Sequence, residues 1–173
     1  MMPHGRIAVT QSIFRESRED DLPAIRRVEE RAYGRTGEAE LAATLIAANI
    51  ETLSLVAERN GKIVGHVLFS RLEGPDTSLA LAPLAVDPDF RDMHIGTELV
   101  RHGLDSARQR GFTSVFVFGQ PDYYCRFGFR SKLADPAAVD WQGPRFLALE
   151  LETGALAGWS GPLAYPEAFS ELA

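Results

Sequence analysis

The sequence predicts an α/β (α+β) domain in which helices flank a β-sheet. Two observations support this prediction. Strand-like and helix-like segments follow one another along the chain, and the stretch 81–129 runs from an apolar strand through a turn into an amphipathic helix and then into a second strand. In addition, Asn60-Gly61 lies between two β-rich runs, which is a strong local signal for a hairpin.

Length and composition favour one folded domain. The chain has 173 residues, of which 45% are hydrophobic and 24% are charged, as in ordinary globular proteins. We expect a single domain over residues 1–173, with a loose lead-in at 1–9 and an irregular packed tail at 153–173. No window approaches the roughly 20 apolar residues of a membrane span, so no membrane partner is expected.

Charge and cysteine content exclude several classes of function. A net charge of -6 and a pI near 5.2 argue against binding to a nucleic-acid backbone. The single cysteine, Cys125, excludes an intramolecular disulfide and a cysteine-based zinc cluster, and no metal site is expected. Together with the lack of an apolar signal segment, this indicates a cytoplasmic location. A homodimer is compatible with the sequence.

The first half of the chain should form two helices and four strands. Asp20 and Asp21 can cap a helix whose apolar side includes Ile25 and Val28 and which ends at Gly34. A run that is apolar at nearly every position suggests a strand covered on both faces. The expected elements are a strand at 12–15, helices at 22–32 and 38–49, hairpin strands on both sides of Asn60-Gly61, and a buried strand at 79–86.

The best-defined helix of the second half begins near Ile95. Its apolar stripe includes Leu99, Val100 and Leu104, and Gly111 can end it in the left-handed conformation. The remaining expected elements are a buried strand at 115–118, a short helix that begins at Pro121, and a strand at 146–151.

Two short motifs flank this helix and its strand. Arg91 and Gly96 fit the outer positions of Q/R-x-x-G-x-G/A, whereas His94 stands where the first glycine belongs. Tyr124 and Gly128-Phe129 fit Y-x-x-x-G-F further along the chain. In this order and spacing, the segment resembles the GNAT superfamily of acyl-CoA-dependent N-acetyltransferases, and the order of elements from about Phe14 to Leu151 matches that family as well.

The resemblance implies a central mixed, largely antiparallel sheet flanked by helices, with a splayed pair of strands that holds CoA. Backbone N–H groups at the start of a helix suit a pyrophosphate, because they are unpaired and lie at the positive end of the helix dipole. In this family such groups cradle the CoA pyrophosphate, and the pantetheine arm follows the preceding strand. The cofactor-binding residues implied by the resemblance are Leu84, Ala85, Val86, Arg91, Asp92, Met93, His94, Ile95, Gly96 and Thr97.

His94 is the main departure from the family pattern. A glycine there lets backbone and phosphate approach closely, whereas a side chain adds bulk and restricts φ. We expect His94 to take ordinary helical dihedrals, with its imidazole turned outward or donating to a phosphate. Arg91 is then the only cation of the loop, and Asp92 places a negative charge beside it.

Tyr124 matches the family's general acid, the phenol that protonates the departing CoA thiolate. A phenol with a pKa near 10 is protonated at neutral pH and can supply this proton. The alternative is that Tyr124 and Tyr123 only pack against Phe127 and Phe129.

The sequence does not single out a general base. His66 is a weak candidate because its ordinary pKa lies near neutrality. It alternates with Val64 and Leu68, so a buried, hydrogen-bonded core histidine is the favoured interpretation. Glu29, Glu30 and Glu38 lie in the first two helices, on the acceptor side in this family.

The resemblance therefore implies an N-acetyltransferase that moves an acetyl group from acetyl-CoA directly to a primary amine of a small molecule or peptide. The alternative is a non-catalytic acyl-CoA-binding sensor with the GNAT fold, which the substitutions at Met93 and His94 favour.

Overall fold

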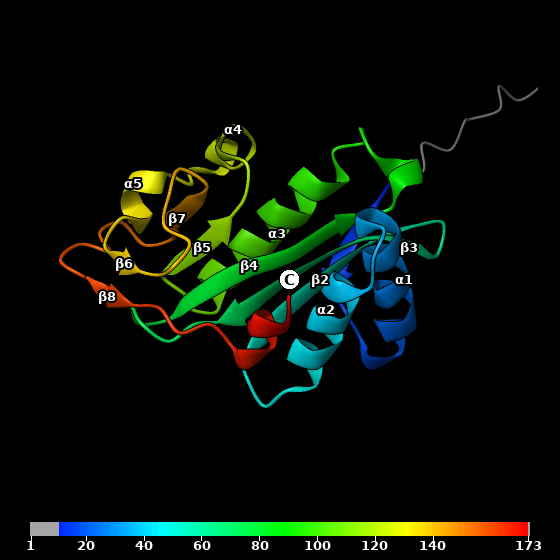
Figure 1. Ribbon diagram of the computed structural model, residues 1–173. Coiled ribbons are helices and arrows are strands. Elements are labelled where there is room, and N and C mark those ends of the chain that lie inside the picture. The colour runs from blue at the N-terminus through cyan, green and yellow to red at the C-terminus, as the bar shows by residue number, and fades with distance from the viewer. Residues whose placement is uncertain (1–10, 173) are drawn as a thin grey trace, which may run out of the picture.

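A computed structural model describes residues 11–172, so the lead-in expected at 1–9 lies outside the described part. One mixed sheet has the strand order β1-β2-β3-β4-β5-β7, and within it only β4 and β5 are parallel neighbours (Figure 1). Its strands are β1 (Ile13–Glu16), β2 (Thr52–Arg59), β3 (Lys62–Arg71), β4 (Ser78–Val86), β5 (Ser114–Phe118) and β7 (Phe146–Glu150). The helices are α1 (Leu22–Tyr33), α2 (Gly37–Ala47), α3 (Ile95–Gln109), α4 (Pro121–Tyr124) and α5 (Ser131–Ala134). The predicted α/β class and largely antiparallel sheet are confirmed.

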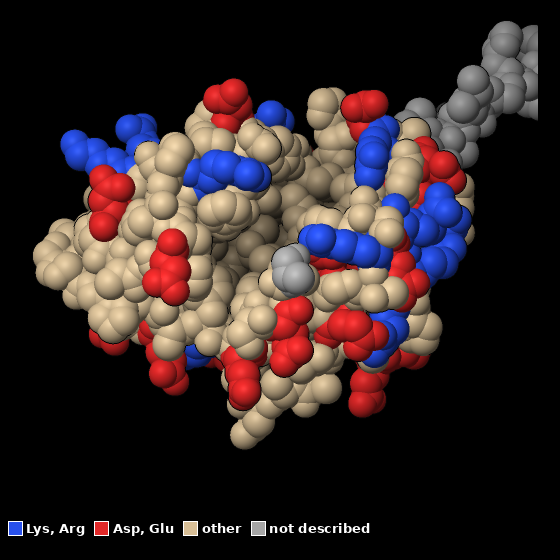
Figure 2. Space-filling model, in the orientation of Figure 1, with Lys and Arg blue, Asp and Glu red and all other residues tan. Residues whose placement is uncertain are grey.

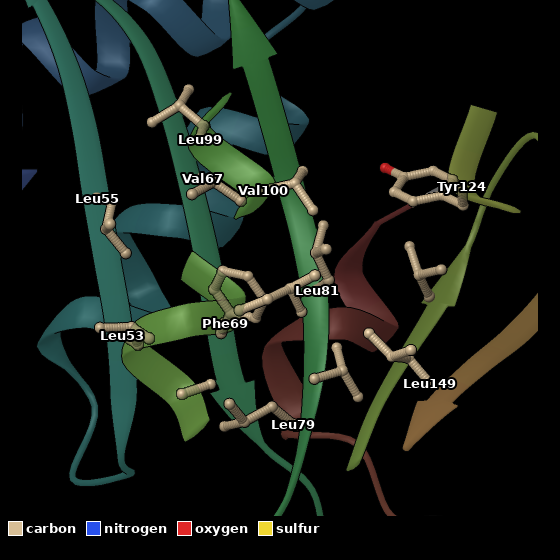
Figure 3. Close-up of a cluster of buried hydrophobic side chains, with 14 of the residues drawn as sticks. Leu53, Leu55, Val67, Phe69, Leu79, Leu81, Leu99, Val100, Tyr124 and Leu149 are labelled. Atoms are coloured by element: carbon tan, nitrogen blue, oxygen red, sulfur yellow. The ribbon is translucent and has the colours of Figure 1, made fainter. Parts of the chain in front are cut away.

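The long helices cover opposite faces of the sheet. Helix α3 packs on β2 and β3 through the apolar stripe predicted from Ile95 onward, and α1 packs on β3 and β4 from the other side. Figure 3 shows Leu99 and Val100 of α3 among the buried side chains of the sheet. Gly103 allows α3 to approach closely, because a Cβ there would collide with the ring of Phe69. Within residues 11–172, no helix has both the length and the apolar character needed to cross a membrane.

The predicted turn residues adopt the expected conformations. Gly34 ends α1 at φ 69°, and Asn60 and Gly61 both have positive φ in the hairpin between β2 and β3. Gly111 follows α3 with φ 88°. These positions are therefore occupied by residues that tolerate the left-handed region.

Strands β4 and β5 part after a short parallel stretch. They pair only where Ser78–Ala80 lies beside Ser114–Phe116. Beyond Ala80, β4 stays paired with β3, while β5 follows β7. The splayed strand pair predicted from the resemblance is thus confirmed, and it opens a gap in the middle of the sheet.

The tail is more ordered than an irregular segment. Gly161–Pro162 forms β8 beside β6 (Ala137–Ala138), and a 3-10 helix, η4 (Glu167–Glu171), packs against α2. Figure 1 shows η4 and the C-terminal end next to α2, in front of the sheet. Elements this short carry no readable hydrophobic period, so the sequence did not predict them.

Candidate active site

A cavity of about 840 Å³ lies where β4 and β5 part. Figure 2 shows the corresponding hollow on the face that carries α2 and the C-terminal end. Its walls come from α1 and α2, from both splayed strands, and from the segment after β6. The lining residues are Tyr33, Arg35, Glu38, Leu41, Ala80, Leu81, Ala82, Pro83, Phe116, Val117, Phe118, Trp141, Arg145, Tyr165, Pro166, Glu167, Phe169, Ser170 and Leu172. The size suits a small ligand.

The wall contributed by Trp141 and the tail was not predicted from the sequence. Trp141, Tyr165 and Phe169 form a chain of edge-to-face aromatic contacts, with ring centroids 5.1 and 5.2 Å apart. Such aromatics offer apolar surface at low conformational cost. The tail lacks periodicity, and the clustering of aromatic residues between 141 and 169 was the one available signal.

The loop between β4 and α3 presents free backbone donors. Among residues 11–172, no protein acceptor takes the N–H groups of residues 92–97, and the first helical bond of α3 runs from the N–H of Glu98 to the carbonyl of His94. Residues 91–94 are exposed, while Ile95 and Thr97 are buried. This geometry suits an anion such as a pyrophosphate.

His94 does not adopt the helical dihedrals expected from the sequence. It lies at φ 60° and ψ 18°, in the left-handed region, and forms the N-cap of α3. Asp92 is also left-handed, with φ 67°. The chain therefore keeps a backbone path that glycine adopts most readily, and it carries a side chain there at a conformational cost.

Replacing His94 by glycine is expected to preserve the fold and to leave CoA affinity unchanged or higher, because glycine adopts this φ without strain. The free energy of unfolding should stay within about 1 kcal/mol of the parent value, since relief of strain and the added chain entropy oppose each other. Calorimetric titration with CoA and urea unfolding measure the two quantities. A clear loss of CoA affinity would instead show that the imidazole itself holds the phosphate.

An ion pair between buried Asp87 and half-exposed Arg31 joins the start of this loop to α1. Asp87 is fully buried and accepts hydrogen bonds from Arg31 at 3.0 and 3.1 Å and from the N–H of Asp89. Burial alone would raise the pKa of Asp87, but these hydrogen bonds outweigh it, so the pKa lies below its usual value. Arg91 donates to the carbonyl of Ala32. The Asp-Pro pair at 87–88 was the sequence signal for this turn.

The last residues of β4 lie beside the gap between β4 and β5. Leu84 and Val86 are partly exposed, and Ala85 is buried against α1. The carbonyl of Leu84 accepts a hydrogen bond from the hydroxyl of Tyr33 at 2.8 Å. Gly96 lies close to this strand, since a Cβ there would be 3.4 Å from the Val86 side chain.

The Tyr124 ring is buried, but its hydroxyl has no hydrogen-bond partner among the described residues. The ring packs against Phe129 and Phe127, as the packing interpretation predicted. No hydrogen bond joins its hydroxyl to another residue between 11 and 172, and Figure 3 shows this oxygen pointing toward β4. Burial raises the pKa of the phenol, so it holds its proton at neutral pH.

Tyr123 points elsewhere and meets the start of α3. Its hydroxyl lies 3.2 Å from that of Thr97, and Arg126 covers its ring at 4.4 Å. The Tyr124 ring lies directly against the backbone of Gly119, where a Cβ would be only 2.5 Å from it. The hydroxyls of the two adjacent tyrosines therefore point to different places, that of Tyr123 to the start of α3 and that of Tyr124 toward β4.

His66 is fully buried and does not line the cavity. Its Nδ1 lies 2.7 Å from Glu29 Oε2, and its Nε2 lies 2.9 Å from the hydroxyl of Ser54, which in turn accepts from Ser17. The second oxygen of Glu29 is buried without a partner among residues 11–172. The role of His66 as a base stays a prediction, and its two ring nitrogens contact Glu29 and Ser54 rather than the cavity.

Val64 and His66 do not share a face of the sheet, contrary to their spacing. The pairing of β2 with β3 shifts between Ala57 and Glu58, which leaves Val64 as an extra residue in a bulge. Val64 consequently joins the core under α3, while His66 faces α1.

Glu29→Gln should change how stability depends on pH. Burial raises the pKa of Glu29 above its usual 4.5, and the negative charge of Glu38 adds to this, while His66 lowers it less. A raised carboxyl pKa gives stability that is full below the unfolded pKa and is lost as pH rises through the folded pKa. The variant lacks this loss, so its stability relative to the parent should rise as the pH rises above about 4.5, by at most about 1.4 kcal/mol per pH unit.

Urea unfolding at several pH values measures this difference. Glu30→Gln is the matched control because Glu30 is the exposed neighbour on the same helix, and its difference should be flat. Parallel pH curves for Glu29→Gln and the parent would show that His66 fully compensates the buried carboxyl.

Comparison with known proteins shows the family of the chain. The model of the acetyltransferase (GNAT) family matches residues 14–129. The uncharacterised N-acetyltransferase YjhQ of Escherichia coli K12 is 39% identical over 135 residues, which cover 73% of this chain and 71% of YjhQ. The uncharacterised N-acetyltransferase YhbS of the same strain is 34% identical over 158 residues, which cover 88% of this chain and 95% of YhbS.

Solved structures extend the similarity to nearly the full length. YhbS from Escherichia coli in complex with CoA has a TM-score of 0.87 at 31% identity, covering 93% of each chain. A GNAT family acetyltransferase from Brucella melitensis in complex with acetyl-CoA has a TM-score of 0.79 at 30% identity, covering 92% of this chain and 99% of that one. With its splayed strands, its open loop and these relatives, the chain belongs to the acetyltransferase (GNAT) family.

Proposed function

We propose that this protein transfers an acetyl group from acetyl-CoA directly to a primary amine bound in the cavity between β4 and β5. The observation that supports the proposal is the parting of β4 and β5: a loop with free N–H groups follows the end of β4, and Tyr124, which follows β5, points its hydroxyl toward β4. The relatives solved with CoA and acetyl-CoA support the choice of cofactor.

The cofactor would bind along the opening. The N–H groups of residues 92–97 would receive the pyrophosphate, and Leu84, Ala85 and Val86 would lie beside the pantetheine arm. Their backbone can donate to the thioester oxygen as negative charge develops on it. Arg91 supplies the nearby positive charge, although part of its guanidinium already donates to Ala32.

The reaction joins the amine nitrogen to the thioester carbonyl carbon and breaks the carbon–sulfur bond. Tyr124 would protonate the departing thiolate, since its hydroxyl keeps its proton and has no protein partner within residues 11–172. Neither β4 nor β5 carries a titratable side chain, so the amine proton must leave to another part of the cavity wall or to water. The carboxylates that line the cavity are Glu38 and Glu167.

Hydrogen exchange with and without CoA tests the cofactor site. CoA should slow exchange of the amides at 92–97, because they would then donate to phosphate. Unchanged protection there at saturating CoA would reject the assignment. Release of CoA thiol from acetyl-CoA on addition of amines tests transfer itself, and a non-catalytic sensor with this fold would show protection without release.

A further inference from the structure

Two arginines line the proposed acceptor cavity, and within the described part of the chain only one of them is paired with a carboxylate. Arg35 donates to both oxygens of Glu38, at 2.9 and 2.5 Å, so its charge is already paired within the wall. Arg145, on the β5 and β7 side, has no carboxylate partner among residues 11–172. It is exposed and lines the cavity. Its charge is therefore available to a ligand.

The position of Arg145 is fixed by its surroundings. Its carbonyl accepts from the N–H of Gly119 at 2.9 Å, and the next residue, Phe146, pairs with Phe118 at the ends of β7 and β5. The guanidinium lies over the Phe118 ring, 5.0 Å from its centroid. A stacked guanidinium keeps its N–H edge free for a carboxylate, so Arg145 is preorganised to bind one.

The surface between Arg145 and the opening is apolar. Phe118 covers the end of β5, and Trp141 and Tyr165 meet edge to face at 5.1 Å on the neighbouring wall. An aliphatic chain or an aromatic ring would bury well on this surface. A polyamine would bring no anion to Arg145 and would leave this wall uncovered by apolar groups.

We propose that the acceptor is an amine that also carries a carboxylate and an apolar or aromatic body, the chemistry of an aromatic amino acid. This inference rests on the proposed function. Arg145 binds the carboxylate, the body lies against Trp141 and Tyr165, and the amine points to the gap between β4 and β5. Arg145 is thus a specificity-determining residue that lies outside the cofactor loop.

Two pairs of probes that differ only in the carboxylate test this inference. The first pair, phenylalanine and phenethylamine, is compared by kcat/KM for CoA-thiol release. The second pair, N-acetylphenylalanine and N-acetylphenethylamine, is compared by calorimetric affinity for the CoA-saturated protein, which needs no turnover. In both pairs the carboxylate compound should be favoured about 10- to 100-fold, the scale of one charge-assisted arginine contact.

Arg145→Gln should abolish this preference, mainly by raising the KM for phenylalanine. Arg108→Gln is the control, since Arg108 lies in the last turn of α3, far from the cavity lining, and pairs with Asp105. An equal preference for both members of a pair, or a preference that survives in Arg145→Gln, overturns the inference. Carboxylate-dependent binding without release of CoA thiol from acetyl-CoA in the presence of any amine would instead reject acetyl transfer and retain the carboxylate site.

Discussion

Tyr124→Phe is expected to lower turnover by about 10- to 1,000-fold with unchanged CoA affinity. The change removes only the phenolic hydroxyl, which makes no hydrogen bond within residues 11–172, so stability should change little. Without this hydroxyl the thiolate must take its proton from water, and general-acid catalysis typically contributes 10² to 10⁴. The measurement is thiol release across pH under conditions where chemistry limits the rate.

Two further variants separate this role from packing. Tyr123→Phe removes a hydroxyl that contacts Thr97 at the start of α3, so it should alter CoA affinity rather than the chemical step. Gly119→Ala should resemble Tyr124→Phe in turnover, because the added methyl displaces the Tyr124 ring. Full activity of Tyr124→Phe would mean that this tyrosine only packs and that the thiolate departs unaided.

His66→Ala is expected to lower the free energy of unfolding by about 3 to 5 kcal/mol at pH 7. The variant leaves the carboxyl of Glu29 buried with neither oxygen paired, and breaking a buried polar pair from one side costs about this much. Such a loss is a large share of the stability of an ordinary domain. Urea unfolding followed by tryptophan fluorescence measures it.

The control is His102→Ala, because His102 is a half-exposed histidine on α3 that should cost no more than about 1 kcal/mol. A double variant with leucine at both 29 and 66 should recover much of the stability, since an apolar pair leaves no buried polar atom unpaired. If His66→Ala alone costs less than about 1 kcal/mol, the Glu29 carboxyl has found water or another partner.

The fold was predictable because it depends on strong local signals. The helix from Ile95, the Asn60-Gly61 turn and the apolar run at 79–86 each follow a period or a turn chemistry that acts within a few residues. The position of the Gly128-Phe129 pair relative to Tyr124 likewise depends on adjacent residues. These features therefore appear in the structure where the sequence indicated.

The acceptor side and the backbone details were not predictable, because they depend on contacts between distant segments. Tyr165 reaches the cavity only through the path of the tail, and His66 meets Glu29 across 37 positions of the chain. The left-handed conformation of His94 is a further example, since tertiary structure imposes on a histidine a backbone angle that its sequence does not favour. The bulge likewise places Val64 on the face of the sheet under α3, opposite to His66.

The cavity wall is built partly from residues within the family model and partly from residues after it, and this has a consequence for how substrate choice could evolve. The segment that matches the family model ends at residue 129, whereas Trp141, Arg145 and Tyr165 follow it. In the proposed function, the residues that bind acetyl-CoA and protonate the thiolate come first along the chain, and much of the wall that would select the acceptor comes after them. If residues 133–172 were exchanged between two relatives, the proposed function predicts that the choice of amine would change while the transfer chemistry would not.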